Sequence, residues 1–352
     1  MRLCFLGDAA NIHIRRRAAW MAERGHQVHV VSLRQAAIPG AAVHHIKPFP
    51  WVGKLNYLLC RRRFIRKIEA IAPDVVDVQF LTSGGFIARQ LKHIPLVATA
   101  WGSDVLVSAR KWRFFANVVK EICAQAATVV AVSDEIATEL NRLGVEVGKI
   151  EIFPLGVDLF QCEQPGTRLP NTPLTILSTR WHEPIYNLEL LIKAIPIVLA
   201  ALPDARFIIA GDGSLKAKLE SMVRKLQVSG NVQFLGRVEH LALRKLYSEV
   251  DIYVSTALSD GSSESLLEAF AGGAFPVVTD IRANKSWVVE GVNGLLVPTK
   301  GPDILAAKII EAGSCQQLRM QAADYNSQIV REKANFNHNM AHLETIYVNC
   351  LQ

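Results

Sequence analysis

The 352-residue sequence predicts an α/β protein with two doubly wound, Rossmann-like domains that face a cleft. Three observations lead to this prediction. The length suits two medium-sized domains better than one. Short apolar segments alternate with longer amphipathic segments, as expected when helices connect parallel strands. The alternation stops near residue 160, at the proline-rich stretch EQPGTRLPNTP (163–173), which reads as a linker, and then begins again.

The first series predicts an N-terminal domain over residues 1–162. Its expected strands are mostly apolar on both faces, as buried parallel strands are. They cover 3–7, 27–32, 75–80, 96–100 and 128–132. A helix is expected over 11–23, before Gly25. Another is expected over 133–143, with Ser133 as the N-cap and Gly144 after its end.

The second series predicts a C-terminal domain over residues 174–335. Its expected strands cover 174–179, 206–210, 232–235, 252–255, 275–279 and 294–297. The helix after Asn187 has an apolar stripe, and Pro196 inside it should kink or shorten it. Residues 336–352 are expected to form a helix that packs back on the N-terminal domain.

Composition bounds the function. Half of the residues are hydrophobic and 20% are charged, which excludes a disordered chain. The six cysteines are scattered without a C-x-x-C pair, so neither a disulfide framework nor a metal site is expected. The N-terminus reads as a buried strand, and no apolar run is long enough for a bilayer, which together predict a cytoplasmic protein. The net charge is +7, and residues 1–160 contain 21 Lys and Arg against 13 Asp and Glu. This excess indicates an acidic partner.

The segment DIYVSTALSDGSSESLLEAFAGGAFP (251–276) carries the most specific chemistry. A strand ends near Ser255, a loop of small residues follows, and a helix should begin near Ser262 or Ser263. Backbone N–H groups at a helix start bind anions such as phosphate. Asp260 can hold sugar hydroxyls, and Glu268 can accept two hydrogen bonds from a ribose diol. On spacing alone, the simpler interpretation is an ordinary strand, loop and helix with both carboxylates in water.

The same segment, LLEAFAGG followed by FPVV, resembles the second half of the E-x7-E motif of the retaining glycosyltransferases of family four. ERGHQVHVVS, TAWGSDVL, PLGVDLF, GNVQFLGRV and EGVNGLLVP resemble further family segments in the expected order, from Arg2 to about residue 312. The resemblance implies the two-domain GT-B fold, with residues 1–162 on the acceptor side and residues 174–335 binding the nucleotide-sugar. It also implies that Glu268 binds the donor ribose and that Asp260, where the family has Glu, contacts the donor sugar.

Two further positions depart from the family. Arg180 stands where an Arg binds the donor diphosphate, but Tyr186 replaces the Lys that usually accompanies it. Arg180 can hold phosphate through two charged hydrogen bonds, whereas Tyr186 donates one neutral bond. The alternative is that Arg180 is a surface arginine. Gln79 replaces a histidine near the sugar, and it cannot take a proton; it can equally be a polar strand terminus.

The resemblance and the spacing together give three sets of expected site residues. The catalytic set is Arg180, Asp260 and Gln79. The donor-binding set is Gly7, Tyr186, Gly236, Arg237, Val238, Gly261, Ser262, Ser263, Glu264, Ser265, Leu266 and Glu268. The acceptor side has His13 and Asp104; a satisfied helix-face residue is the alternative for His13.

The expected reaction is metal-independent, retaining transfer of a sugar from a nucleotide-sugar to a glycan or lipid-linked acceptor. No D-x-D pair and no second catalytic carboxylate are recognised. The resemblance implies that the leaving phosphate accepts the acceptor proton. No cofactor is expected, because the nucleotide-sugar is a substrate. Two alternatives remain: a GT-B nucleotide-sugar epimerase, and a non-catalytic nucleotide-sugar-binding subunit.

Two basic segments with aromatic residues, 51–71 and 110–115, predict peripheral contact with an anionic membrane on its inner face. The alternative is an ordinary surface helix with solvated arginines. Nucleic acid is not an expected partner, because no nucleic-acid-binding module is recognised. A role in cell-surface polysaccharide synthesis is an expectation from the resemblance and from this basic half.

Overall fold

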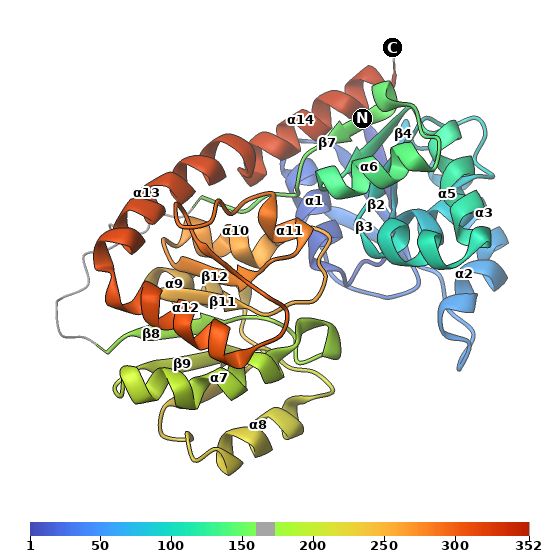
Figure 1. Cartoon of the computed structure of the whole chain (residues 1–352). Coiled ribbons are helices and arrows are strands. Elements are labelled where there is room, and N and C mark those ends of the chain that lie inside the picture. The colour runs from blue at the N-terminus through green and yellow to red at the C-terminus, as the bar shows by residue number, and fades with distance from the viewer. Residues whose placement is uncertain (160–172, 352) are drawn as a thin grey trace. The chain divides into compact units, whose positions relative to one another are not determined.

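The computed structural model describes residues 1–159 and 173–351. It divides into two compact units, Met1–Leu155 with Asn337–Gln352 (unit 1) and Gly156–Phe336 (unit 2). Each unit is built on one sheet whose strands all run parallel (Figure 1). Of the predicted linker 163–173, all but Pro173 lies outside the described residues.

Unit 1 contains a seven-stranded sheet in the order β3-β2-β1-β4-β5-β6-β7. Its strands are β1 (Arg2–Leu6), β2 (Gln27–Ser32), β3 (Ala41–His45), β4 (Val75–Gln79), β5 (Leu96–Ala100), β6 (Thr128–Ala131) and β7 (Ile150–Ile152). The five predicted strands are confirmed to within one residue at each end. The sequence pattern misses β3 and β7, which lie at the two edges and are only partly buried.

The helices of unit 1 are α1 (Ile12–Glu23), α2 (Asn56–Leu59), α3 (Arg61–Ile71), α4 (Gly85–Ala88), α5 (Arg113–Gln125), α6 (Asp134–Arg142) and α14 (Phe336–Asn349). Asn11 caps α1 by accepting a bond from the His13 N–H. Ser133 occupies the N-cap position of α6, but its hydroxyl makes no capping bond, which corrects that part of the prediction.

Alternating side chains of the unit 1 strands form two apolar faces. Leu6 and Val78 point into a core shared with α3, α5 and α6. Phe5 points the other way, and its ring meets that of Tyr347 edge-on, with centroids 6.5 Å apart. Tyr347 is fully buried. The C-terminal helix α14 is therefore part of unit 1 and completes one face of its sheet.

Unit 2 contains a six-stranded sheet in the order β10-β9-β8-β11-β12-β13. Its strands are β8 (Thr175–Ser178), β9 (Arg206–Ala210), β10 (Val232–Gly236), β11 (Ile252–Ser255), β12 (Phe275–Thr279) and β13 (Leu295–Val297). Its helices are α7 (Leu188–Ala201), α8 (Lys216–Lys225), α9 (His240–Glu249), α10 (Glu264–Ala271), α11 (Arg282–Lys285), α12 (Pro302–Ser314) and α13 (Gln316–Lys333). All six predicted strands are present.

The sheet of unit 2 is also buried on both faces. Ile176 and Ile252 pack toward α7 and α12, whereas their neighbours Leu177 and Tyr253 pack toward α9, α10 and α13. This alternation is the reason that the strands read as continuous apolar runs. Pro196 lies inside α7, which continues to Ala201, so the proline does not end the helix; the kink stays a prediction.

Candidate functional site

Except for Gly7, which lies in unit 1, the residues predicted to bind the donor gather at the carboxyl edge of the unit 2 sheet. Strand order reverses between β8 and β11, which lie side by side at the centre of the sheet. In open parallel sheets, ligands bind outside the carboxyl ends of strands at such a reversal. Arg180 follows β8 by two residues, and Asp260 lies in the loop that connects β11 to α10.

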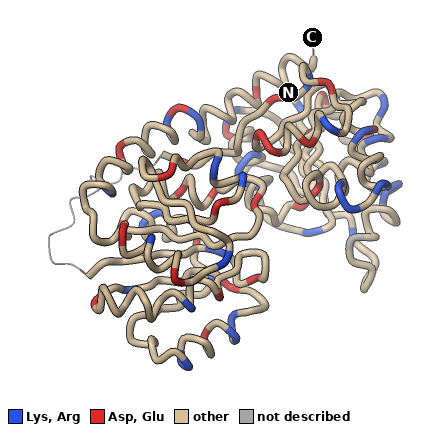
Figure 2. Tube along the Cα trace, viewed as in Figure 1, with Lys and Arg blue, Asp and Glu red and all other residues tan. Residues whose placement is uncertain are grey.

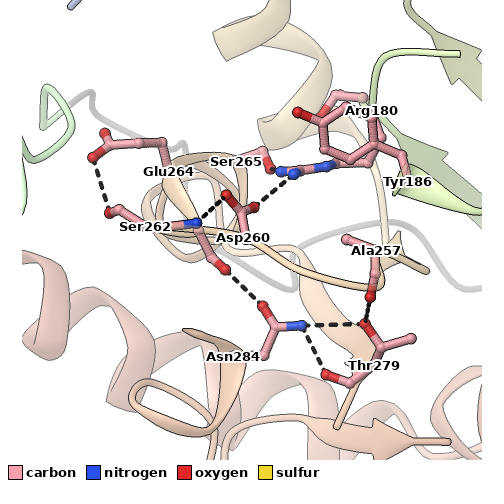
Figure 3. Close-up of polar contacts among 12 residues, drawn as sticks. Arg180, Tyr186, Ala257, Asp260, Ser262, Glu264, Ser265, Thr279 and Asn284 are labelled. Carbon is pink, nitrogen blue, oxygen red and sulfur yellow. Dashed lines mark hydrogen bonds and ion pairs between the residues drawn. The ribbon is translucent and has the colours of Figure 1, made fainter. Parts of the chain in front are cut away.

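Arg180 is the centre of this cluster (Figure 3). Its Nη2 atom lies 2.6 Å from Oδ2 of Asp260, and its Nη1 atom donates to the Ser265 hydroxyl at 2.5 Å. The guanidinium also stacks on the Tyr186 ring, 4.3 Å from the ring centroid. The Arg180 side chain is only 9% exposed, so the surface-arginine alternative is wrong.

Electrostatics keep Arg180 charged. Burial by itself would lower the pKa of its guanidinium, but the negative charge of Asp260 raises that pKa above the ordinary value. Burial also raises the pKa of the Tyr186 hydroxyl, although the nearby Arg180 acts in the opposite direction. The site therefore holds a permanent cation beside a neutral phenol.

Hydrogen bonds between the two loops fix this geometry. The Tyr253 hydroxyl donates to Ser265 at 2.8 Å, and the Thr256 hydroxyl donates to the Tyr186 carbonyl at 2.9 Å. The Leu258 N–H also donates to the Ile185 carbonyl at 2.8 Å. The loop after β8 and the loop after β11 are thus joined, and a ligand meets a largely pre-organised site.

Hydrogen bonds through Asn284 and Thr279 also hold the start of α10. Ser263, at the N-cap position, donates its hydroxyl to Asn284 at 2.7 Å instead of capping the helix. Asn284 donates to the Thr279 carbonyl at 2.8 Å, and the Thr279 hydroxyl donates to the Ala257 carbonyl at 2.6 Å (Figure 3). The Glu264 and Leu266 N–H groups already donate to the Ser262 and Ser263 carbonyls at 2.8 and 2.9 Å, so a phosphate oxygen at this helix start would accept from the other N–H groups of the turn.

The other predicted residues of this loop differ in what they offer. The Gly261 N–H donates to Oδ1 of Asp260 at 2.9 Å, and the Ser262 hydroxyl donates to Glu264 at 3.2 Å. Leu266 is 1% exposed within the apolar core. Its N–H already donates to the Ser263 carbonyl. Because its side chain is buried in the core, that side chain supports the helix and does not face a ligand.

Glu268 belongs to α10, and its side chain approaches the start of α9. Its Oε1 atom is 3.4 Å from Nε2 of His240, and its side chain is 16% exposed. The pKa of the neighbouring Tyr247 hydroxyl is raised, first by burial and then by the negative charge of Glu268. Neither Glu268 nor Asp260 is in open water, so the simple strand, loop and helix interpretation does not hold. The sequence pattern misses His240 and Tyr247.

The expected base-binding segment, Gly236, Arg237 and Val238, begins at the last residue of β10. Gly236 has a φ of +66°, and its carbonyl accepts a bond from the Gly211 N–H at 2.7 Å. Arg237 is exposed and Val238 is half-buried. His240 begins α9 two residues later and reaches Glu268, so this segment and the ribose candidate lie close together.

The predicted residues of unit 1 form a second cluster at its own strand reversal, between β1 and β4. Gln79 is buried and accepts a bond from the Trp101 indole N–H at 2.8 Å. The His13 ring stacks on Trp101 with centroids 4.8 Å apart. A Cβ atom at Gly7 would lie 2.8 Å from that of Gln79, which explains the glycine. The sequence analysis misses Trp101, although an aromatic residue directly after a strand is a usable signal.

Asp104 is an anchor of the backbone. It is 1% exposed, and its carboxylate accepts bonds from the N–H groups of Leu81, Gly102 and Val105 at 2.9–3.1 Å. Burial raises its pKa, while these backbone bonds lower it. The carboxylate is thus already engaged, and it holds the loop after β5.

Basic residues gather along α3 and α5 of unit 1 (Figure 2). Exposed apolar side chains lie beside them, with Trp51 and Leu55 before α2 and Trp112 and Phe114 at the start of α5. Arg110 differs from the others because it donates to Glu139 through both Nε and Nη2, at 3.1 and 2.9 Å. Of the helices within residues 1–159 and 173–351, none has the length and apolar character to span a bilayer.

Across the part of the chain that the structure describes, His, Cys, Asp and Glu side chains form no group of three or more that could hold a metal ion.

Comparison with known proteins identifies the family. The family model described as Glycosyl transferases group 1 matches residues 163–328, and that described as Glycosyltransferase Family 4 matches residues 10–160. A phosphatidyl-myo-inositol mannosyltransferase of Mycolicibacterium smegmatis is 27% identical over 322 residues, which cover 87% of this chain and 81% of that protein.

Solved structures share the fold. A sucrose-phosphate synthase from Thermosynechococcus elongatus superposes with a TM-score of 0.83 at 17% identity, over 99% of both chains. Anabaena HepE, in complex with UDP and glucose, superposes with a TM-score of 0.79 at 17% identity, over 99% of this chain and 100% of that one. The chain belongs to the family 4 type of glycosyltransferases and has their two-domain GT-B fold.

Proposed function

We propose that this glycosyltransferase moves a sugar, with retention and without a metal, from a nucleotide-diphosphate sugar to a glycan or lipid-linked acceptor. The observation that carries the proposal is the buried Arg180 beside Asp260 and Ser265, where the start of α10 meets the carboxyl end of β8. This arrangement provides a fixed cation and helix N–H groups for a diphosphate, next to a carboxylate for sugar hydroxyls.

The nucleotide-sugar donor has support from two sides. Within the chain, Glu268 lies close to the start of α9 and to the segment expected to contact the base. Among similar folds, HepE has been solved with UDP and glucose and also with UDP-glucose. The expected division of roles is that Glu268 holds the ribose, Arg180 the diphosphate and Asp260 the sugar.

The chemistry follows from where charge develops. Cleavage of the anomeric bond places negative charge on the departing diphosphate, and pre-organised donors aimed at that charge lower the barrier. Arg180 and the N–H groups of α10 supply those donors, so the chain can stabilise the leaving group without a metal. The leaving phosphate then takes the proton of the acceptor hydroxyl, which attacks from the same face. Gln79 needs no proton transfer role in this scheme.

A lipid-linked acceptor is supported by the chemistry of the surface and by similarity. The M. smegmatis relative is named as a transferase to phosphatidyl-myo-inositol, a lipid. Exposed Arg62 and Arg66 on α3 lie near the exposed apolar residues of α2. Basic surfaces with apolar anchors bind anionic lipid. We therefore infer peripheral attachment to the inner face of a membrane, and a role in polysaccharide or glycolipid synthesis.

The donor is tested first, by thermal unfolding with UDP, GDP, ADP and dTDP sugars. Ligand at 100 times its dissociation constant adds about 2.7 kcal/mol of stability. We expect one nucleotide to raise the melting temperature of the wild type, and Glu268→Ala to reduce that shift. Glu311→Ala, an exposed change on α12, should not reduce it. No shift with any nucleotide would contradict the proposal and favour a non-catalytic role.

Retention and metal independence have their own assay. The anomeric configuration of the product, read by NMR, should match that of the donor, and turnover should persist in EDTA. An inverted product, or activity restored only by a divalent cation, would contradict these parts of the proposal. Product analysis also separates transfer from epimerisation, because only transfer requires the acceptor.

Membrane attachment is measured by co-sedimentation with phosphatidylglycerol and phosphatidylcholine vesicles. We expect binding to the anionic vesicles, and its loss in the Arg62→Glu, Arg66→Glu double variant. The matched control is Arg224→Glu with Lys225→Glu, an equal charge change at the exposed end of α8. Equal binding by both double variants would contradict a specific role for α3.

A further inference from the structure

Arg180 and Asp260 are expected to bind different parts of a donor, yet they bind each other. The distance between Nη2 and Oδ2 is 2.6 Å, and the two side chains are 9% and 18% exposed. We propose that this pair is a latch, in which Asp260 competes with the donor diphosphate for Arg180 and so favours the intact nucleotide-sugar over the nucleoside diphosphate product. The inference rests on the proposed function.

Two N–H donors of the guanidinium are engaged, Nη2 by Asp260 and Nη1 by Ser265, while Tyr186 covers one face of the group. The Nε atom is buried, so a phosphate that binds in the bidentate way meets the two Nη atoms. It therefore competes with Asp260 for Nη2. The pair already has the short contact of a charge-assisted bond, so its replacement has a real energetic cost.

The sequence around Arg180 strengthens this competition. Arg180 is the only Lys or Arg in residues 180–187, because Tyr186 stands where the family resemblance places a lysine. A second cation there would bind phosphate without opening the pair. With Tyr186 in place, the charge that this segment offers to a diphosphate is largely cancelled by Asp260.

A nucleotide-sugar and a nucleoside diphosphate differ in the hydrogen-bond donors that they offer to the released Asp260. A nucleotide-sugar gives the released Asp260 new partners, since the sugar hydroxyls donate to its carboxylate. A nucleoside diphosphate has no sugar, so the released carboxylate gains nothing in exchange. Asp260 then returns to Arg180 after transfer and weakens the hold on the product. The latch thereby couples recognition of the sugar to retention of the diphosphate, and it promotes product release.

The test is calorimetric titration of the full chain at fixed ionic strength with inorganic pyrophosphate, UDP, GDP and the matching nucleotide-sugars. Asp260→Asn removes the competing charge. We expect it to bind pyrophosphate and the nucleoside diphosphate roughly tenfold more tightly than the wild type, as the loss of a charged competing bond predicts. Its preference for the nucleotide-sugar over the diphosphate should disappear.

Two further variants make the result specific. Asp204→Asn removes an equal charge from an exposed turn before β9, at the opposite edge of the same sheet, and should leave every affinity unchanged. Asp260→Ser should reproduce the gain of Asp260→Asn, and it serves as the second variant if the amide disturbs the fold. The melting temperature of each variant reports its folding.

The outcomes separate the two claims. If neither Asp260 variant binds pyrophosphate more tightly than the wild type, the latch is overturned. A gain in pyrophosphate affinity without binding of any nucleotide would overturn the proposed function, while supporting the competition between Asp260 and phosphate. A gain for both ligands, with the preference for nucleotide-sugar unchanged, would also overturn the latch as a selectivity device.

Discussion

The Tyr347 hydroxyl donates to the Asp77 carboxylate at 2.5 Å, although 270 residues separate the two in the chain. Both side chains are buried in unit 1, where α14 covers the sheet. Arg17 of α1 lies 3.7 Å from the same carboxylate, and the Thr99 hydroxyl donates to it at 3.3 Å. Burial raises the pKa of Asp77, and Arg17 and Tyr347 both oppose that rise. The C-terminal helix thus partners a charge that the sheet cannot satisfy alone.

Removal of this hydroxyl should loosen α14. Tyr347→Phe keeps the ring that packs on Phe5 but leaves Asp77 short of a partner. A buried group that loses its hydrogen bond costs about 1–3 kcal/mol. Denaturant unfolding should report that loss, and amide exchange should accelerate in α14. Tyr325→Phe, on an exposed position of α13, is the control. Equal stability of the two variants would show that the Asp77 bond contributes nothing.

Much of the fold is predictable because buried parallel strands appear in the sequence as short, continuous apolar runs. Ile252–Ser255 and Phe275–Thr279 are apolar on both faces, and both are placed correctly from the sequence. The edge strand β3 is missed because its partly exposed residues lack that pattern. The reach of α14 to Asp77 depends on contacts between distant segments, for which local periodicity carries no signal.

The candidate site, like the fold, is predictable where local spacing determines it and not where packing between distant segments does. The spacing around Asp260 and Glu268 identifies the loop and the helix start, since both follow from local chain geometry. The partners do not follow. Ser265 holds Arg180, and His240 approaches Glu268 from a different helix. Such contacts arise from packing between elements, and one sequence alone does not specify which side chain fills each place.

A histidine pair predicts how unit 1 responds to acid. Nδ1 of His29 and Nε2 of His44 lie 2.9 Å apart on neighbouring strands. Burial lowers the pKa of both rings, and Arg2 and Lys67 add to this effect on His29 and His44, respectively. The unfolded chain therefore binds protons more readily, so stability is present above about pH 6.5 and falls as the pH drops below it.

The measurement for this pair is the free energy of unfolding between pH 7.5 and 5. His44→Gln should flatten the dependence on pH, because it removes one of the two rings whose pKa is lowered in the folded chain. His93→Gln, an exposed change in the same unit, should leave the slope as it is in the wild type. If His44→Gln retains the full slope, the acid sensitivity originates elsewhere.

Arg180 should matter for the chemical step. Loss of one pre-organised donor to a developing negative charge lowers kcat roughly 100- to 1,000-fold. We expect Arg180→Ala to show that loss with the identified donor. Arg180→Lys should fall in between, because it keeps the charge but not the planar fork. Arg206→Ala, exposed at the amino end of β9, is the control. Unchanged turnover in Arg180→Ala would refute the role in leaving-group stabilisation.

Tyr186 should act on Arg180 through its ring. Stacking of a guanidinium on an aromatic face contributes about 0.5–2 kcal/mol, which is roughly a 2- to 30-fold change in affinity. Tyr186→Ala should weaken donor binding by an amount in this range, measured by calorimetry. Tyr186→Phe keeps the ring and should bind nearly as well as the wild type. If the phenylalanine variant loses as much as the alanine variant, the hydroxyl is the important group and the stack is not.

His240 should position Glu268 for the ribose. Its Nε2 atom lies 3.4 Å from the carboxylate, at the first position of α9. His240→Ala removes this contact, and one hydrogen bond to a charged group corresponds to about a tenfold loss of affinity. The loss should appear with a nucleoside diphosphate and not with inorganic pyrophosphate, since pyrophosphate has no ribose. His240→Gln, which retains a donor, should recover part of the nucleotide affinity. Equal losses with both ligands would mean that His240 supports the phosphate site or the fold. That result would contradict a role for His240 in positioning Glu268.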